Sequence, residues 1–261
     1  MGLIDINNFG NLKIINNSMQ LITLYPSFRL DTFFFENMYK AEDFFNKDIK
    51  WTKLGYLIDK ISNGENLATD WYSVEGDSKV MYLSVSQITE FGLEEKNNSF
   101  LREEILEETF GRNQRNISLI EKNMIIVTRS GSPGIAISTN HPSFEYEEYD
   151  YVPSGFLIYF NLRDDLGLNP NVISYYLNLR PVRYYLIANS SGRCQRNISQ
   201  EILMDLPVPE ELLDAKKQSE ILKFYELIER ESIEANNIIR DVNKKLEGLW
   251  DHSWEEFNKL I

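Results

Sequence analysis

The sequence predicts an α/β domain of mixed α+β type, followed by a long C-terminal helix of the coiled-coil type. Between residues 80 and 206, short apolar segments of strand length alternate with turns rich in Gly, Pro, Asn and Ser. Segments whose apolar residues recur at helical spacing lie before and among them. From Glu210 to Trp250 the chain contains no Pro and one Gly, and apolar residues recur every seven positions.

The composition is that of a globular protein, with 261 residues of which 43% are hydrophobic and 13% aromatic. One cysteine, Cys194, and two histidines argue against a disulfide framework and against a metal centre. The chain contains no apolar run of membrane-spanning length and no signal peptide at its start, so we expect a soluble, cytoplasmic protein. We predict three regions: 1–49 with a short amphipathic helix, 50–207 as the α/β domain, and 208–261 as the long helix.

The predicted elements follow from local patterns. Apolar residues at helical spacing predict one helix from Leu30 to Phe45, and a second helical unit from Trp51 to Ile61 that ends at Asn63-Gly64. Short apolar runs predict strands at 80–85, 135–137 and 156–160, and one or two strands over 117–119 and 124–128. Two further helices are expected at 172–179, after Asn169-Pro170, and at 199–203. Gly and Pro predict a loop over 129–134, and another loop starts at Ser190.

The C-terminal segment is expected to be one helix that starts at Pro209, because acidic residues in a first turn favour a helix start. Forty helical residues extend about 60 Å, more than a globule of this size covers, so the apolar stripe needs a partner. The alternative is a break at Asn236-Asn237 that folds the helix back on its own domain. The predicted dimer or partner seam consists of Ile221, Tyr225, Ile228, Ala235, Ile239, Val242, Leu246 and Leu249.

Charge is unevenly distributed along the chain. The net charge is −13, from 27 Lys/Arg and 40 Asp/Glu. Residues 1–110 hold 10 basic against 18 acidic residues (−8), 111–200 hold 9 against 7 (+2), and 201–261 hold 8 against 15 (−7). Eight of the nine basic residues in the middle block are arginines, whose planar guanidinium suits phosphates and guanine edges. The total argues against a free-standing nucleic-acid binder, whereas the middle block favours one.

An ordered set of short motifs carries a resemblance to a known family. These motifs are Phe28-Arg29-Leu30-Asp31, Trp51-Thr52-Lys53-Leu54-Gly55, Tyr82 to Ile88, Ser130 to Gly134, Val152-Pro153-Ser154-Gly155, Asn169-Pro170, Tyr175-Tyr176-Leu177, Gly192 to Ser199, and Leu206-Pro207-Val208-Pro209 with Gln218 and Ile221. In this order the chain resembles the specificity (S) subunit of type I restriction-modification systems, in a half-subunit form with one target recognition domain. Full-length S subunits are similar to two such units in tandem. Here Lys217-Gln218 stands where the family commonly has Glu-Gln, and residues 1–27 match no part of the family.

The resemblance implies a subunit without catalytic activity of its own. Its recognition domain is expected to read a half-site in double-stranded DNA. Its helix is expected to dock against a second recognition unit, in a homodimer or with another half-subunit, and against methyltransferase (M) subunits. Those M subunits would bind S-adenosylmethionine and methylate adenine, so no cofactor is expected on this chain. A restriction (R) subunit is a further expected partner.

The candidate DNA-binding residues lie in two Gly-containing loops and one polar cluster. Base edges are read by Arg, Asn, Gln, Ser and Thr side chains, and glycines let the backbone approach phosphates. The predicted residues are Arg112, Arg115, Arg129, Ser130, Ser132, Arg193, Gln195, Arg196 and Asn197. The alternative is that these turns are purely structural and that Gln195 braces the following helix. Tyr146, Tyr149 and Tyr151 alternate with acidic residues, so we expect them to pack on the core.

Two other functions remain open from the sequence. An acidic interaction module that imitates the charge of DNA would bind a DNA enzyme without binding DNA. A hydrolase with a carboxylate site is the other alternative, although no spacing of carboxylates indicates an acid–base pair. The sequence contains no phosphate-binding, dinucleotide-binding or methyltransferase motif.

Overall fold

A computed structural model describes residues 32–74, 78–94, 98–106, 118–192 and 195–228, together with 230, 231, 238, 241 and 242. The chain divides into two compact units, Met1–Ala215 and Lys216–Ile261. This division differs from the predicted boundaries 1–49, 50–207 and 208–261. Helix α2 (Thr32–Phe45) packs along α5 (Arg180–Asn189), so the described part of the predicted N-terminal segment belongs to the first unit's core.

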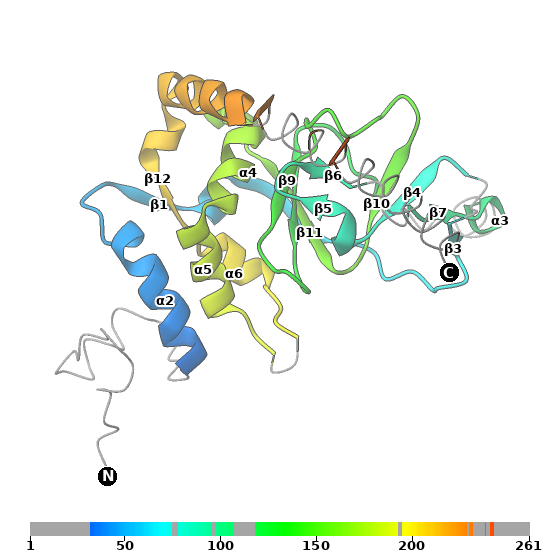
Figure 1. The fold of residues 1–261 in the computed structure, drawn as a ribbon, viewed down its shortest axis with the longest axis horizontal. Coiled ribbons are helices and arrows are strands. Elements are labelled where there is room, and N and C mark those ends of the chain that lie inside the picture. Colours follow the sequence, from blue (N-terminus) through cyan, green and yellow to red (C-terminus); the bar gives the residue numbers. More distant parts are fainter. Residues whose placement is uncertain are drawn as a thin grey trace, which may run out of the picture. The chain divides into compact units, whose positions relative to one another are not determined.

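A four-stranded antiparallel sheet forms the centre of the first unit (Figure 1). Its strand order is β2 (Ile58–Asn63), β11 (Leu157–Leu162), β8 (Met124–Thr128) and β9 (Ala136–Ser138). All five residues of β8 are buried, as a continuous apolar run predicts for a strand covered on both faces. The strands predicted at 124–128, 135–137 and 156–160 are therefore confirmed, with shifts of one or two residues at their ends.

A second four-stranded sheet has the order β10-β4-β7-β3. Strand β10 (Asp150–Pro153) runs parallel to β4 (Val80–Leu83), while β7 (Phe100–Leu101) pairs antiparallel with both β4 and β3 (Tyr72–Ser73). Strands β5 (Ile88–Thr89) and β6 (Gly92–Leu93) form a hairpin, and α3 (Glu103–Ile105) is a single turn. The strand predicted at 80–85 is confirmed as β4.

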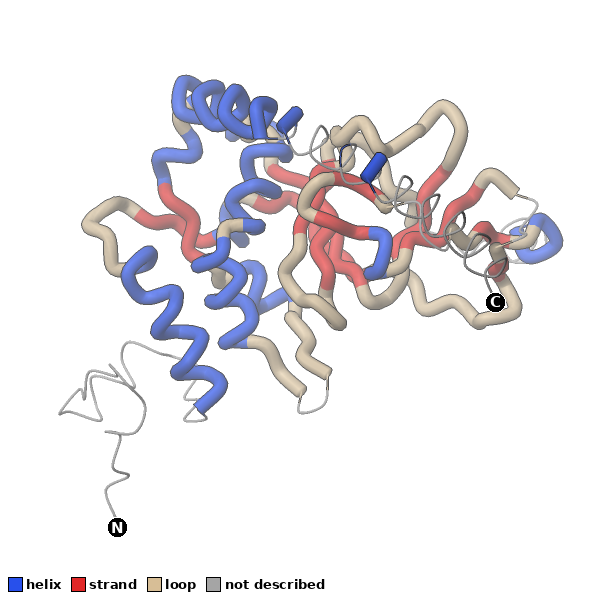
Figure 2. Tube along the Cα trace, in the orientation of Figure 1, coloured by secondary structure: helices blue, strands red, loops and turns tan. Residues whose placement is uncertain are grey.

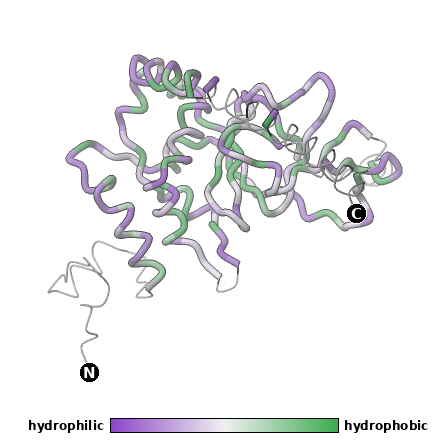
Figure 3. Tube along the Cα trace, viewed as in Figure 1, coloured by the Kyte–Doolittle hydropathy of each residue, from purple (hydrophilic) through white to green (hydrophobic). Residues whose placement is uncertain are grey.

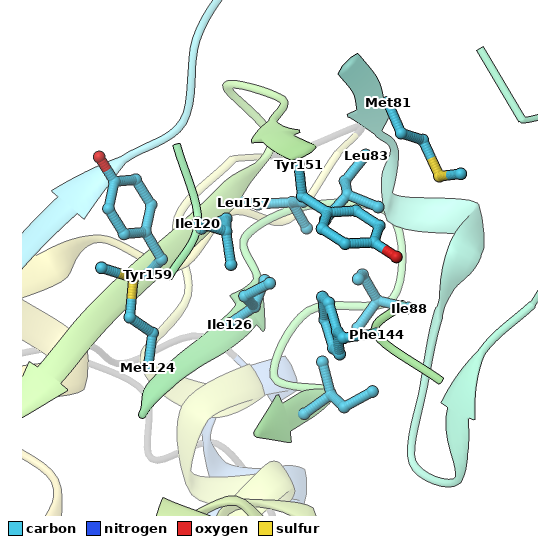
Figure 4. Packing of buried hydrophobic residues seen from close by; sticks show 11 residues of the cluster. Met81, Leu83, Ile88, Ile120, Met124, Ile126, Phe144, Tyr151, Leu157 and Tyr159 are labelled. Atoms are coloured by element: carbon cyan, nitrogen blue, oxygen red, sulfur yellow. The ribbon is translucent and has the colours of Figure 1, made fainter. Parts of the chain in front are cut away.

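The main core lies between these two sheets (Figure 4). Met124 and Ile126 of β8 and Leu157 of β11 meet Leu83 of β4 and Tyr151 of β10 there. Tyr146 and Tyr149 pack against the same cluster, which confirms that this tyrosine-rich segment packs on the core. Figure 3 shows the corresponding concentration of hydrophobic residues along the central strands.

Helices cover one end of the central sheet and the face that is turned away from the main core (Figure 2). Helix α4 (Pro170–Asn178) packs on β8 and β9, α5 follows it directly, and α6 (Gln200–Met204) completes the group. Asn169 caps α4 by accepting a hydrogen bond from the Asn171 N–H, and Ser199 caps α6 by accepting from the Ile202 N–H. Both predicted helices are confirmed, but α5 was not predicted.

The segment from Trp51 to Ile61 corrects a prediction. It forms β1 (Trp51–Lys53), a 3-10 helix (Leu54–Tyr56) and the start of β2, instead of one helical unit. Strand β1 pairs antiparallel with β12 (Pro207–Pro209), more than 150 residues away in the sequence, and no local pattern reveals that partner. Leu54 and Leu57 are buried. Residues 118–119 form no strand, so of the one or two strands predicted over 117–119 and 124–128 the structure shows β8; Ile117 lies outside the described residues.

The C-terminal helix begins later than predicted. Glu210–Leu213 form a 3-10 helix, Asp214 is extended, and the described α-helix runs from 215 to 228. Of the predicted seam, Ile221, Tyr225 and Ile228 are half-exposed, and Val242 is 48% exposed. Ala235, Ile239, Leu246 and Leu249, and the possible break at Asn236-Asn237, lie outside the described residues. Helix-mediated pairing therefore stays a prediction.

The later start also changes where the acidic charge lies. Residues 201–215 hold five acidic residues and no basic ones, which leaves 10 acidic and 8 basic residues (−2) in 216–261. The first unit therefore carries −11 of the total of −13. Within the described residues, no helix combines the length and the apolar character that crossing a membrane requires.

Candidate nucleic-acid interface

The first loop, predicted at 129–134, spans 129–135 between β8 and β9 and is closed around Thr128. The Thr128 hydroxyl donates to the Ser132 carbonyl (2.6 Å) and accepts from the Ile135 N–H (2.9 Å). The Thr128 N–H donates to the Ile135 carbonyl (2.8 Å), and the Gly134 N–H to the Thr128 carbonyl (2.9 Å). These four bonds hold the loop in one conformation above the end of the sheet.

Asn178 of α4 fixes the other side of this hairpin. Its side-chain oxygen accepts from the Ala136 N–H (2.9 Å), and its side-chain nitrogen donates to the Ala136 carbonyl (2.8 Å). Strand β9 is the last strand of its sheet, so Asn178 satisfies backbone groups that have no neighbouring strand.

Replacement of Asn178 by leucine is expected to lower the unfolding free energy by about 1–3 kcal/mol, because the Ala136 backbone groups lose their partners inside the fold. A chain of this size should then melt several degrees lower. Thermal unfolding followed by circular dichroism measures the effect. Asn63→Leu, at an exposed strand end, is the matched control and should leave the melting temperature within about 1–2 °C. Equal shifts in both variants would contradict the assigned role.

The second predicted loop, 191–197, is closed by a backbone bridge. The Ser191 N–H donates to the Asn197 carbonyl (2.9 Å), and the Asn197 N–H donates to the Ser191 carbonyl (2.8 Å). Gly192 has φ +100°, and a Cβ there would stand 2.1 Å from the Gln195 carbonyl oxygen. Only glycine therefore fits this turn.

The structure brings the two loops together. The Ile198 N–H, directly after the second loop, donates to the Arg129 carbonyl (2.9 Å) in the first. A Cβ on Gly134 would lie 3.3 Å from Leu186 and 3.6 Å from Ile198, which shows how closely the first loop packs beside the second. Loops about 60 residues apart in the sequence thus form one continuous surface.

A third segment, the turn 153–156, is hydrogen-bonded to the first loop. The Arg129 N–H donates to the Phe156 carbonyl (2.8 Å), and the Arg129 guanidinium donates to the Gly155 carbonyl (3.5 Å). We call the described residues 129–135, 153–156, 191–192 and 195–197 the three-loop surface. The turn was not among the predicted site residues; its Pro-Ser-Gly sequence ahead of a buried strand was the available signal.

The turn is held by Glu65, which follows β2, and by Tyr82 of β4. The Glu65 N–H donates to the Pro153 carbonyl (2.7 Å), and the Gly155 N–H donates to the Glu65 carbonyl (2.8 Å). The Tyr82 hydroxyl donates to that same Glu65 carbonyl (2.7 Å). Burial raises the pKa of Tyr82, so the phenol stays neutral and keeps the proton that this bond needs.

The predicted residues differ in what they offer at this surface. Ser132 and Gln195 are exposed, and Arg129 and Asn197 are half-buried. Ser130 is only 2% exposed, so in this structure its hydroxyl presents no group to a DNA groove, contrary to expectation. Arg112, Arg115 and Arg193 lie outside the described residues.

Arg196 has a partner that the sequence did not reveal. Its guanidinium stacks on the Phe33 ring of α2, with 3.8 Å between the guanidinium carbon and the ring centroid. Such a cation–π contact holds the side chain in place while its N–H groups stay available at the edge. Two other arginines of the middle block are engaged in ion pairs: Arg183 with Glu90, and Arg163 with Asp165 (2.7 Å), where the guanidinium lowers the pKa of the Asp165 carboxyl.

A separate depression on the β2–β11 side bears on the hydrolase alternative. It has a volume of about 430 Å³ and is lined by Lys60, Ser62, Ser118, Leu119, Glu121, Met124, Tyr159 and Asn161. Glu121 is the single carboxylate among these lining residues, so the depression contains no pair of carboxylates. Within the described ranges, no three His, Cys, Asp or Glu residues gather closely enough to hold a metal ion.

The comparison with known proteins concerns the fold. No protein-family profile and no curated protein matches the sequence. A chain from a structure on complex assembly and conformational transition of the type I R-M system superimposes with a TM-score of 0.51 at 12% identity, covering 88% of this chain and 53% of that one.

Two further structures give lower scores. The type I restriction-modification S subunit from M. genitalium has a TM-score of 0.45 and 19% identity, over 71% of this chain and 40% of that one. The HsdS subunit from Thermoanaerobacter tengcongensis has a TM-score of 0.46 and 13% identity, over 76% of this chain and 43% of that one. The chain therefore spans about half, or less, of the length of the solved chains it resembles, and at these identities the resemblance establishes the fold alone.

Proposed function

We propose that this chain is a DNA sequence-recognition subunit of a type I-like restriction-modification complex, and that the three-loop surface reads a half-site. The observation that carries the proposal is the convergence of the loops 129–135 and 191–197, which were selected from sequence for base-reading side chains. The fold on which they converge is similar to that of a chain from a type I R-M complex.

The geometry suits base reading because hydrogen bonds close both loops and join the first loop to the residue that follows the second. Base-specific recognition requires donors and acceptors placed against groove edges, with little freedom to move. Ser132 and Gln195 supply exposed groups of this kind, and Arg129 and Arg196 add guanidinium donors. The backbone around Gly131 and Gly192 is exposed and has no Cβ, so it leaves space for a close approach to phosphates.

The charge of the first unit requires partners. At −11, this unit repels a polyanion on its own. We propose that methyltransferase subunits, which would hold S-adenosylmethionine and methylate adenine, supply the basic surface for the phosphates. The C-terminal helix would dock against them and against a second recognition unit, in a homodimer or with another half-subunit. A restriction subunit would join the same assembly.

Two recognition units held apart by paired helices would read a bipartite target with a fixed gap. Identical halves would make that target palindromic. Methylation mapping in cells that carry this gene together with its methyltransferase gene should reveal a bipartite motif, and the motif should vanish when this gene is deleted. Methylation that is unaffected by the deletion would overturn the proposal.

A gel-shift assay separates this function from the DNA-imitating alternative. The chain alone should bind DNA weakly, and the chain with its methyltransferase should bind tightly, with an affinity that falls steeply as salt rises because phosphate contacts release counterions. An acidic DNA mimic would instead bind a DNA enzyme tightly and give no shift, with or without the methyltransferase.

A further inference from the structure

Phe156 is an exposed aromatic ring in an otherwise buried turn. Its exposed fraction is 53%, whereas the residues on both sides, Gly155 and Leu157, are buried. Leu157 enters the main core, so the chain turns inward directly after Phe156. The Phe156 ring would become buried only if the backbone of the turn moved.

The backbone bonds of the turn prevent that movement. The Arg129 N–H holds the Phe156 carbonyl (2.8 Å), and the Leu157 N–H donates to the Ser154 carbonyl (2.8 Å). A Cβ on Gly155 would stand 2.0 Å from the side-chain oxygen of Asn66, which shows how tightly the turn packs on its support. The exposed ring is therefore carried by a rigid base.

The ring also belongs to the surface that we assign to DNA. Arg129 lies in the first predicted loop and binds the carbonyls of both Gly155 and Phe156. Ser132 and Gln195 are exposed polar residues of the same surface. A single ring is far smaller than the apolar core of a protein–protein interface, whose two sides each bury about 800 Å².

We infer that the Phe156 ring contacts the 5-methyl group of a thymine in the major groove. The inference rests on the proposed function. A phenylalanine ring has no hydrogen-bonding group, so it reads a base edge only through an apolar feature, and the thymine methyl is that feature in the major groove. Arg129, which fixes the turn, then acts as a positioning residue for this contact.

Deoxyuridine tests the contact because it differs from thymidine only in lacking the methyl group. The complex of this chain with its methyltransferase is titrated with duplexes carrying the mapped target, in which each half-site thymine is replaced in turn. For the wild-type chain, one replacement should weaken binding about fourfold, the factor expected for losing one buried methyl group. Phe156→Ala should weaken binding to the unmodified target by a similar factor.

The decisive readout is the combination of the two changes. Phe156→Ala should respond to that replacement with no further loss, and Phe156→Leu should retain part of the response. Independent losses that multiply, a wild-type chain that tolerates every replacement, or a half-site without thymine would each overturn the inference. These outcomes leave sequence-specific binding intact, whereas failure of the proposed function would show as no binding by the wild-type complex.

Discussion

Replacing Phe160 by alanine is expected to lower the unfolding free energy by about 3–5 kcal/mol, the range found for removing a buried aromatic ring from a core. Phe160 is fully buried in the middle of β11. Its neighbours across the sheet are Ile61 of β2 and Ile125 of β8, so the vacated space is bounded by two strands that pair with β11 on both sides. Because neither strand is able to close the gap without breaking that pairing, most of the cavity should persist.

The melting temperature of Phe160→Ala should fall by about 6–20 °C for a unit of this length. Phe156→Ala is the matched control, since it removes the same ring four residues earlier in the chain from a side chain that is 53% exposed. The control should change the unfolding free energy by no more than about 0.5 kcal/mol. Urea unfolding followed by circular dichroism compares the two variants. A loss of similar size at both positions would contradict the assigned burial of Phe160.

Replacing Gly192 by alanine is expected to reduce DNA binding by the methyltransferase complex at least about tenfold. The residue has φ +100°, outside the range that alanine favours, and the added Cβ would lie 2.1 Å from the Gln195 carbonyl oxygen. The loop has to open to relieve this contact, and the Ser191–Asn197 bridge would open with it. Ser132 and the displaced Gln195 would then no longer share one fixed surface.

Gly167→Ala separates loop geometry from the general cost of a left-handed residue. Gly167 has φ +59°, and a Cβ there would meet no atom within 4 Å. This variant should therefore lose about 1 kcal/mol of stability and keep its DNA affinity. Gel-shift titrations measure affinity, and circular dichroism confirms that both variants are folded. Unchanged binding by a folded Gly192→Ala variant would show that the 191–197 loop does not read DNA.

The elements that sequence reasoning identified are those whose signals are local. Asn169 and Ser199 cap α4 and α6 with their own side chains, and each cap lies next to the helix it starts. The apolar run 124–128 is a strand buried on both faces, and its composition alone indicates this. Helix α5 was missed because it follows α4 after a single residue, Leu179, and its mean hydropathy is low.

The errors lie where distant partners decide the conformation. The segment from Trp51 to Ile61 has apolar residues at helical spacing, but β12 supplies a pairing partner for β1, and β11 supplies one for β2. Backbone hydrogen bonds to those strands outweigh the weak local preference. The C-terminal helix starts at 215 because β12 and the 3-10 helix use the residues that precede it.

In the candidate site, too, local features were predicted and contacts between distant segments were not. Residue types and turn glycines indicated two polar loops, and those indications depend only on neighbouring residues. Ser130 is buried, Arg196 stacks on Phe33, and Arg129 binds both the turn at Phe156 and Ile198; each of these facts depends on contacts between segments far apart in the chain. Side-chain chemistry and turn preferences depend on short stretches of sequence. The burial of a residue and the meeting of two loops depend instead on which distant segments pack together, so they are decided only when the sheets and helices pack around a common core.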